Sequence, residues 1–192
     1  MEAINSNKKP YAYVVPKNQV DPITTKEMLE ILRFAEVEIH EAQDEFIADG
    51  LAFPAGTSVI LTSQPYGAFA KTMLEVQHYP NLLEYPGGPP KRPYDVTAHS
   101  LPLQMGVESI QVKERFEAKL RLTDDLMPAK GEIREHGVDR AKVYFLRPET
   151  NASVRAVNTL LKAGCKVGRA LQRFRAEGDW YPAGTFIVAG GQ

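Results

Sequence analysis

The sequence predicts an α/β fold in which two related strand–helix–strand–strand units pack together and a connecting segment joins them. Short apolar or alternating runs that stop at proline or glycine predict the strands, and apolar residues at helical spacing predict the helices. One phrase, FPAGTSVIL at Phe53–Leu61, returns as YPAGTFIVA at Tyr181–Ala189. With 43% hydrophobic residues, the 192-residue chain can form a packed core.

The first unit is expected over residues 11–64. Strands are predicted at Tyr11–Val15, Val37–His40 and Phe53–Leu61, and an amphipathic helix at Thr25–Ala35. Asp21-Pro22 is typical of a turn. A capping box should begin the helix, with Thr24 accepting from the first turn and Glu27 reaching back.

The connecting segment is expected over residues 65–140. Its first helix should follow Ser63-Gln64-Pro65, with Phe69, Met73 and Val76 on the inner face. The run YPGGPPKRPY at Tyr85–Tyr94 predicts a loop. A short helix within Asp95–Met105, entered through Ser100 and Pro102, should stop at Gly106. Strands are predicted at Val107–Val112 and Phe116–Leu122, before a polar, turn-rich stretch at residues 123–139.

The second unit is expected over residues 141–192, within a single domain that spans residues 1–192. A strand at Lys142–Leu146 precedes a helix that Asn151 or Ser153 can cap and that Gly164 ends. The predicted inner face of this helix is Val154, Val157 and Leu161. A strand at Cys165–Val167 and the phrase YPAGTFIVA complete the unit.

The two units align with a shift of 128 residues. Between residues 46–64 and 174–192, eight of nineteen positions are identical, where unrelated segments would share about one or two. The pairs are Phe46/Phe174, Ala48/Ala176, Gly50/Gly178, Pro54/Pro182, Ala55/Ala183, Gly56/Gly184, Thr57/Thr185 and Gln64/Gln192. Upstream, Tyr13–Pro16 is matched with Phe145–Pro148, at a difference of four residues in loop length. The pattern predicts a duplicated module.

The repeated PAGT phrase is interpreted as a turn at the entrance of a strand. Proline fixes φ, glycine permits positive φ, and threonine begins a β-branched run. A ligand-binding loop is the alternative, but a catalytic loop need not occur in both copies.

The net charge of the chain argues against two classes of binding partner. The formal net charge is −1, which does not indicate binding to nucleic acid or to an anionic membrane. The beginning of the sequence does not resemble a signal peptide, and no window approaches 18 consecutive apolar residues. The compartment is left open.

The candidate nucleophiles and metal ligands are few. Cys165 follows a predicted helix and enters a strand, which is the reverse of a nucleophile elbow, so a buried thiol is expected. Asp95 and His99 could share a helix face at i, i+4 and hold a metal or relay a proton, or could simply form a hydrogen-bonded pair. No third ligand accompanies them in the sequence. No catalytic residue and no metal ligand is therefore predicted.

One position is favoured for binding a small ligand. Ser63, Gln64 and Tyr66 lie between a strand's carboxyl end and a helix, where open α/β sheets place ligands, and Asp95 and His99 are added to this candidate site. The loop GGPPKR lacks the lysine–serine ending of a phosphate-binding loop. Tyr79, Tyr85 and Tyr94 flank that loop and could line a peptide groove, or could pack the loop onto the body.

Three phrases together resemble a known family. QVDP at Gln19–Pro22, the run from Phe53 to Pro80, and KRPYDVTAHSLPLQMGV at Lys91–Val107 are similar to a region of large bacterial zinc-carboxypeptidase-like proteins. In that family the region follows a metallocarboxypeptidase catalytic domain and precedes a domain similar to class I glutamine amidotransferases. WYPAGTFIVAGGQ resembles the continuation of the region, so the resemblance covers residues 11–192.

The resemblance implies a non-catalytic accessory domain. The HxxE zinc motif is absent, and His99 stands where the family phrase has an aromatic residue, often tryptophan. No cofactor is therefore expected in this chain. The expected partner is the parent's catalytic domain or another of its domains, and the resemblance implies a parent family that is exported. In the parent, zinc-activated water and a glutamate base would remove a C-terminal residue from a peptide.

Two other functions stay open at this point. The chain could be an independent small-ligand binding domain that uses Ser63–Tyr66 with Asp95 and His99, in which case a metabolite should stabilise it. It could also be an amidotransferase-like enzyme or hydrolase. In that case Cys165→Ala and His99→Gln would abolish its activity.

Overall fold

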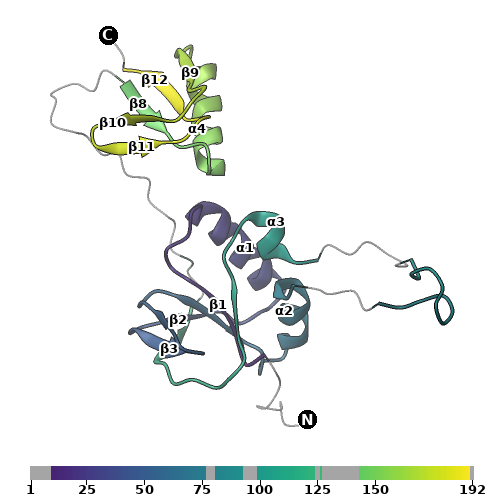
Figure 1. Ribbon diagram of the computed structural model, residues 1–192. Coiled ribbons are helices and arrows are strands. Elements are labelled where there is room, and N and C mark those ends of the chain that lie inside the picture. Colours follow the sequence, from purple (N-terminus) through teal and green to yellow (C-terminus); the bar gives the residue numbers. More distant parts are fainter. Residues whose placement is uncertain (1–9, 77–80, 93–98, 124–125, 127–142, 191–192) are drawn as a thin grey trace. The chain divides into compact units, whose positions relative to one another are not determined.

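The computed structural model describes residues 10–76, 81–92, 99–123, 126 and 143–190. The chain forms two compact units, one made mainly of residues 1–127 and the other mainly of residues 128–192. Both units combine helices with antiparallel sheets (Figure 1), so the α/β class is confirmed. Within the described residues, no helix is long and apolar enough to cross a membrane.

The first unit is built on a five-stranded antiparallel sheet. Its order is β6-β1-β5-β2-β7, and β3 and β4 form a separate hairpin. The elements are β1 (Ala12–Val15), α1 (Pro22–Phe34), β2 (His40–Ala42), β3 (Phe46–Ala48), β4 (Leu51–Phe53), β5 (Ser58–Leu61), α2 (Gly67–Leu74), α3 (Leu101–Met105), β6 (Ile110–Val112) and β7 (Leu120–Leu122).

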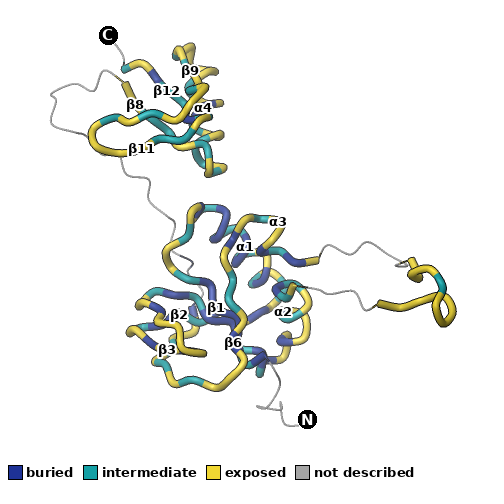
Figure 2. Tube along the Cα trace, in the orientation of Figure 1, coloured by how far each residue is buried: buried dark blue, intermediate teal, exposed yellow. Residues whose placement is uncertain are grey.

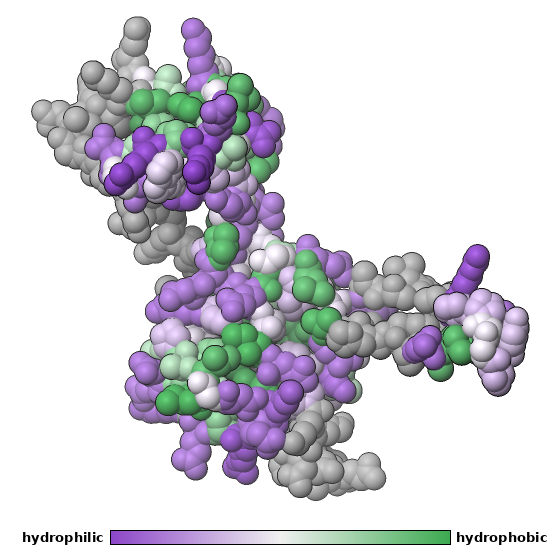
Figure 3. All heavy atoms as spheres, in the orientation of Figure 1, coloured by the Kyte–Doolittle hydropathy of each residue, from purple (hydrophilic) through white to green (hydrophobic). Residues whose placement is uncertain are grey.

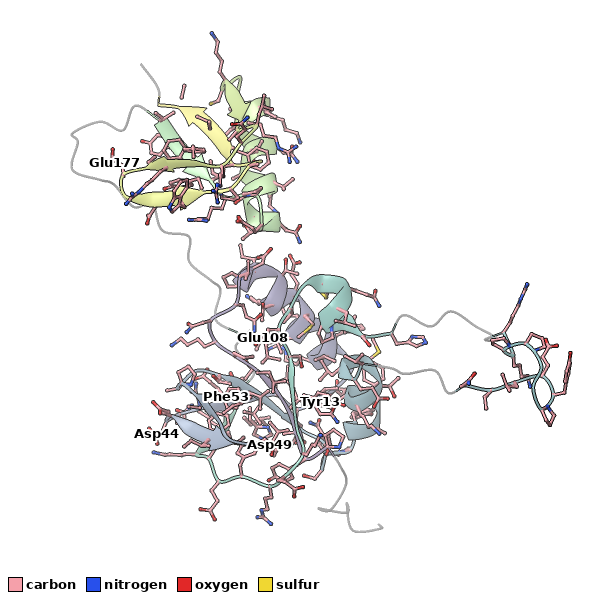
Figure 4. The ribbon with its side chains drawn as sticks, in the orientation of Figure 1. Tyr13, Asp44, Asp49, Phe53, Glu108 and Glu177 are labelled. Atoms are coloured by element: carbon pink, nitrogen blue, oxygen red, sulfur yellow. The ribbon has the colours of Figure 1, made fainter. Side chains whose placement is uncertain are left out.

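The two faces of this sheet bury two separate cores, because side chains alternate along each strand. On one face, Tyr13, Ile39 and Ile60 pack with residues of α1 and α2. On the other face, Val14 and Val59 pack with the β3–β4 hairpin. Figure 4 labels Tyr13 near α2 and Phe53, from the hairpin, near β3.

The second unit has a smaller sheet. Its three strands are in the order β8-β12-β9, and β10 and β11 form a hairpin. The elements are β8 (Val143–Leu146), α4 (Asn151–Lys162), β9 (Val167–Arg169), β10 (Phe174–Ala176), β11 (Asp179–Tyr181) and β12 (Phe186–Ala189). This is the same order of a strand, a helix and four strands that begins the first unit.

The backbone repeats the alignment of the sequences in detail. Residues with positive φ recur 128 positions apart: Glu36 and Gly164, Asp49 and Glu177, Gly50 and Gly178, and Gly56 and Gly184. Asp49 and Glu177, both labelled in Figure 4, lie in the turns of the two hairpins. A left-handed conformation is costly for any residue except glycine and persists only where the surrounding fold imposes it, so its recurrence at matched positions indicates a shared local fold.

The PAGT phrase forms the same turn in both units, as predicted. Gly56 (φ 83°) donates its N–H to Ala42 O at 2.7 Å, and Gly184 (φ 91°) donates to Ala170 O at 2.8 Å. Thr57 and Thr185 are both completely buried. The turn immediately precedes β5 or β12, so these residues serve the strand entrance.

The upstream alignment of the repeat was wrong by one residue. Val15 pairs with Ser58, and Leu146 pairs with Phe186, which is 128 residues after Ser58. Val15 therefore corresponds to Leu146, and Tyr13 corresponds to Tyr144. The predicted match of Pro16 with Pro148 failed because β8 is followed by Arg147 before its proline, so the loops differ by three residues and not four.

Both predicted helix caps were also wrong. Asp21 caps α1, since its Oδ1 accepts from the N–H groups of Ile23 and Thr24, both at 3.2 Å. Pro22 then occupies the first helical position, where no donor is lost. At α4 the cap is Thr150, whose Oγ1 accepts from the Ser153 N–H at 3.1 Å. Gly106 and Gly164 end α3 and α4 in left-handed conformations, as predicted.

The predicted inner faces of two helices need correction. In α2 the buried residues are Gly67, Ala70 and Leu74. Of the predicted face, Met73 packs against the core, but Phe69 is 39% exposed and Val76 lies beyond the helix. In α4 only Val157 is buried, and Val154 and Leu161 are exposed. Apolar spacing located both helices but not the side each presents, because both sides of these helices contain apolar residues.

Several strand boundaries also differ from the predictions. The predicted strand at residues 53–61 is two strands, β4 and β5, separated by the PAGT turn. Strand β2 begins at His40, not Val37, and β9 begins at Val167, not Cys165. In both units the left-handed residue after the helix adds length before pairing can begin. The predicted strands at residues 107–112 and 116–122 shorten to β6 and β7.

Candidate functional site

The predicted ligand residues near the end of β5 take part in the fold. Gln64 is only 5% exposed. Its Oε1 accepts from the Glu38 N–H at 2.6 Å, and its Nε2 donates to Glu38 O at 3.1 Å and Leu61 O at 2.7 Å. The Gln64 side-chain amide thus bonds both main-chain groups of Glu38, as a residue of a neighbouring strand would. Ser63 is half-buried and Tyr66 is exposed.

The tight turn beside Gln64 leaves little space for a ligand at the backbone. A Cβ on Gly67 would lie 1.9 Å from the carbonyl oxygen of Thr62. Only glycine can therefore begin α2 so close to the end of β5. The phrase SQPYG is accounted for by this chain reversal and by the Gln64 hydrogen bonds.

The other two predicted site residues do not form the expected helix pair in the described part of the chain. His99 is exposed and precedes α3, outside any helix, and Asp95 lies outside the described residues. The helix pair proposed for them is therefore not observed. Ser100, next to His99, donates its hydroxyl to Glu75 O. Among the described residues, no three His, Cys, Asp or Glu side chains are grouped as a metal site requires.

The proline-rich loop folds back on itself. Leu83 and Pro90 form an isolated bridge, and Lys91 donates its N–H to Leu82 O at 2.7 Å. Tyr85 is 62% exposed and stands close to Gly88. Tyr79 and Tyr94 lie outside the described residues. Cys165, which follows α4, is a free thiol that is only half-buried, so the expected full burial is wrong.

A surface that the sequence reasoning missed lies around the β10–β11 hairpin of the second unit. Arg147 donates from Nη2 to Trp180 O at 2.8 Å, and its guanidinium lies 5.1 Å from the centre of the Tyr181 ring. Arg173 lies 5.3 Å from the Trp180 ring, which is 57% exposed. Arg169 lies 5.9 Å from the Phe186 ring. These arginines and rings form what is here called the arginine–aromatic surface.

The apolar residues beneath this surface are only partly covered. Phe174 and Tyr181 stack at 5.2 Å, as their counterparts Phe46 and Phe53 stack at 5.1 Å in the first unit. The first-unit pair is buried, whereas the second-unit pair is half-buried. Figure 2 shows the same contrast along the strands, and Figure 3 shows apolar side chains at the surface of the second unit.

The contrast extends over both faces of the second sheet. Val143 and Tyr144 are exposed, although their counterparts Ala12 and Tyr13 are almost completely buried. Ala170 and Ile187 are half-buried, and their counterparts Ala42 and Val59 are buried. Burial of apolar surface is the main favourable term in folding and association. The second unit therefore retains apolar surface that a further polypeptide could cover.

Comparisons of the chain with known protein families, with characterised proteins and with solved structures gave no match.

Proposed function

We propose that this chain is a non-catalytic accessory module of a zinc-carboxypeptidase-like protein and that its second unit is a docking surface for another polypeptide. The main support is the unequal burial of matched residues in two units that share one fold. Phe46 is 5% exposed and its counterpart Phe174 is half-buried, although each ring stacks on an equivalent hairpin partner, Phe53 or Tyr181. A unit with such a surface suits association more than catalysis.

The structural roles of the most distinctive residues support the same proposal. The PAGT phrase, Gln64 and Gly67 all have structural roles, which leaves none of them as a catalytic group. In this proposal the zinc, the activated water and the glutamate base belong to the parent's catalytic domain. The family resemblance of residues 11–192 suggests that this domain, or a neighbouring one, is the docking partner.

The test is direct binding to a catalytic domain. The full chain would be titrated with a purified metallocarboxypeptidase-type domain taken from a protein that contains the phrases of residues 53–107. We expect a saturable complex, while the chain alone binds no stoichiometric zinc and releases no C-terminal residue from a blocked peptide. Tightly held zinc together with hydrolysis by the chain alone would exclude the accessory role.

A further inference from the structure

In the first unit, one segment covers the hairpin side of the sheet. This covering segment, residues 110–122, begins as β6, crosses the hairpin and ends as β7. Strand β6 pairs with β1, and β7 pairs with β2. Between them, the Phe116 ring stacks 5.0 Å from the Phe46 ring. The hairpin turn also holds the segment, because Asp49 accepts from the N–H groups of Lys113 at 2.7 Å and Glu114 at 3.2 Å.

The second unit has counterparts of all four attachment points. Strands β8 and β9 each pair with β12, and within the described residues neither has a second neighbour. Phe174 stands at the position of Phe46. Glu177, at φ 50°, stands at the position of Asp49 in the hairpin turn. No described segment occupies the place of the covering segment.

The first unit shows which backbone N–H and C=O groups at the open edge of β9 an added strand could bond. In the first unit the Thr123 N–H donates to Ile39 O at 3.0 Å, and the Gln43 N–H donates to Lys119 O at 2.9 Å. The corresponding groups are Val167 C=O and Leu171 N–H. Leu171 is 92% exposed. By the period of an antiparallel ladder, the main chain of Arg169 faces the same open edge.

Charge distinguishes the two edges. Glu41 of β2 lies opposite Arg121 of β7 and pairs with it at 3.5 Å. The counterpart of Glu41 is Arg169, and the counterpart of Glu45 is Arg173. Over residues 143–190 the chain has seven Arg or Lys residues and three Asp or Glu residues. A strand with arginine at the Arg121 position would be repelled there, whereas one with an acidic residue would be attracted.

These observations identify a partner chemistry. We propose that an extended polypeptide segment adds as an antiparallel strand to β9, with an apolar–acidic–apolar pattern whose acidic residue lies opposite Arg169. The proposal rests on the docking function proposed above and specifies its edge and its ligand. A second copy of β9 is a poor occupant, because antiparallel pairing at Arg169 would bring two arginines together.

Two synthetic peptides provide the test. Both copy residues 108–123, and one contains the change Arg121→Glu. Titrated into the full chain, the glutamate peptide should bind about fivefold more tightly than the arginine peptide, the effect expected from exchanging repulsion for attraction across strands. On binding, the Leu171 amide should become protected from hydrogen exchange. A third peptide, the glutamate peptide N-methylated at position 121, should lose binding because it lacks a main-chain donor.

A charge-reversal variant locates the contact. Arg169→Glu in the full chain should reverse the preference between the two peptides. Lys162→Glu makes the same charge change at an exposed position of α4 and should leave the preference unaltered. Fluorescence of Trp180, the single tryptophan, would verify that the second unit of each variant is folded.

Equal affinity of the two peptides, no effect of Arg169→Glu, or an unprotected Leu171 amide would each refute strand addition at β9. A chain that is dimeric alone and becomes monomeric with Arg169→Glu would identify a second copy as the occupant and also refute it. If neither peptide binds while the catalytic domain does, only this inference fails. If the glutamate peptide binds as expected and the catalytic domain does not, the accessory function fails instead.

Discussion

The first and second units share the same backbone plan but differ in what covers it. Their left-handed residues, their PAGT turns and their buried threonines coincide at a shift of 128 residues. The covering segment and helices α2 and α3 occur only in the first unit, as far as the chain is described. The residues of the turns are therefore sufficient to give both units the same backbone fold. Burial of the core depends instead on segments that are distant in sequence.

The largest expected difference concerns the stacked phenylalanines. Phe46→Ala should lower the free energy of unfolding of the first unit by about 3 kcal/mol, because it leaves a cavity beneath Phe116. Phe174→Ala removes the same atoms from a half-buried site, so its cost should be about half as large. Both free energies of unfolding are measured by urea titration. Circular dichroism follows the first unit, and Trp180 fluorescence follows the second unit.

Equal costs at the two positions would contradict this contrast. The result would mean that Phe174 is as fully covered in solution as Phe46. The docking surface proposed for the second unit would then have no physical basis. The conservative variants Phe46→Leu and Phe174→Leu serve as matched controls, since they retain most of the apolar volume.

A pH effect is expected from Tyr13, the buried tyrosine of β1. Burial, with a smaller contribution from the Glu75 carboxylate, raises the pKa of Tyr13 far above its ordinary value of 10.0. The folded first unit keeps this phenol neutral, so its contribution to stability is complete below about pH 10. Above that pH only the unfolded chain releases the proton, and the free energy of unfolding should fall by about 1.4 kcal/mol per pH unit.

The variant Tyr13→Phe should remove this alkaline loss of stability. Its hydroxyl has no hydrogen-bond partner in the described part of the chain, so the substitution should cost little at neutral pH. Tyr144→Phe, at the exposed counterpart, is the matched control. An alkaline loss that persists in Tyr13→Phe would mean that another group is responsible.

The sequence was sufficient for the fold class, the repeat and its turns. PAGT was informative because its turn depends on local residues alone. Proline fixes φ and glycine adopts a positive φ, and both copies contain the same residues. Helix faces and strand starts were predicted less well. Val154 and Leu161 are apolar but exposed, and periodicity alone cannot identify which side of α4 faces the sheet.

The candidate site was the least predictable part. Gln64 looked like a ligand residue because of its place after β5, and only its hydrogen bonds to Glu38 reveal a structural role. The arginine–aromatic surface joins Arg147 to Arg173 and Tyr181 of the hairpin region, which lie much later in the sequence and form no motif with it. Its exposure can be recognised only against the first unit, where the matched residues are covered. The pairing of the strands shows which residues of the two units correspond.

The two buried threonines should respond in opposite directions to the same substitution. Thr185 donates its hydroxyl to Pro182 O at 2.8 Å, so Thr185→Val should destabilise the second unit by about 1 kcal/mol. The Thr57 hydroxyl is buried without a partner among the described residues, so Thr57→Val should stabilise the first unit by about 1 kcal/mol. Chemical unfolding with the two reporters above measures both. Losses of the same size would mean that the two turns are hydrogen-bonded alike.

The smallest expected effect is that of the ion pair that holds β7 to β2. Arg121→Gln should cost about 0.5 kcal/mol, because both side chains are partly exposed and solvent screens the pair. A double-mutant cycle with Glu41→Gln isolates the interaction, which should vanish in about 1 M salt. Strand pairing and Phe116 thus contribute most of the stability of the covered edge, and the charge pair contributes selectivity. If the cycle instead gave several kcal/mol, charge would dominate this edge, and Arg169 would then discriminate between acidic and basic strands far more strongly than about fivefold.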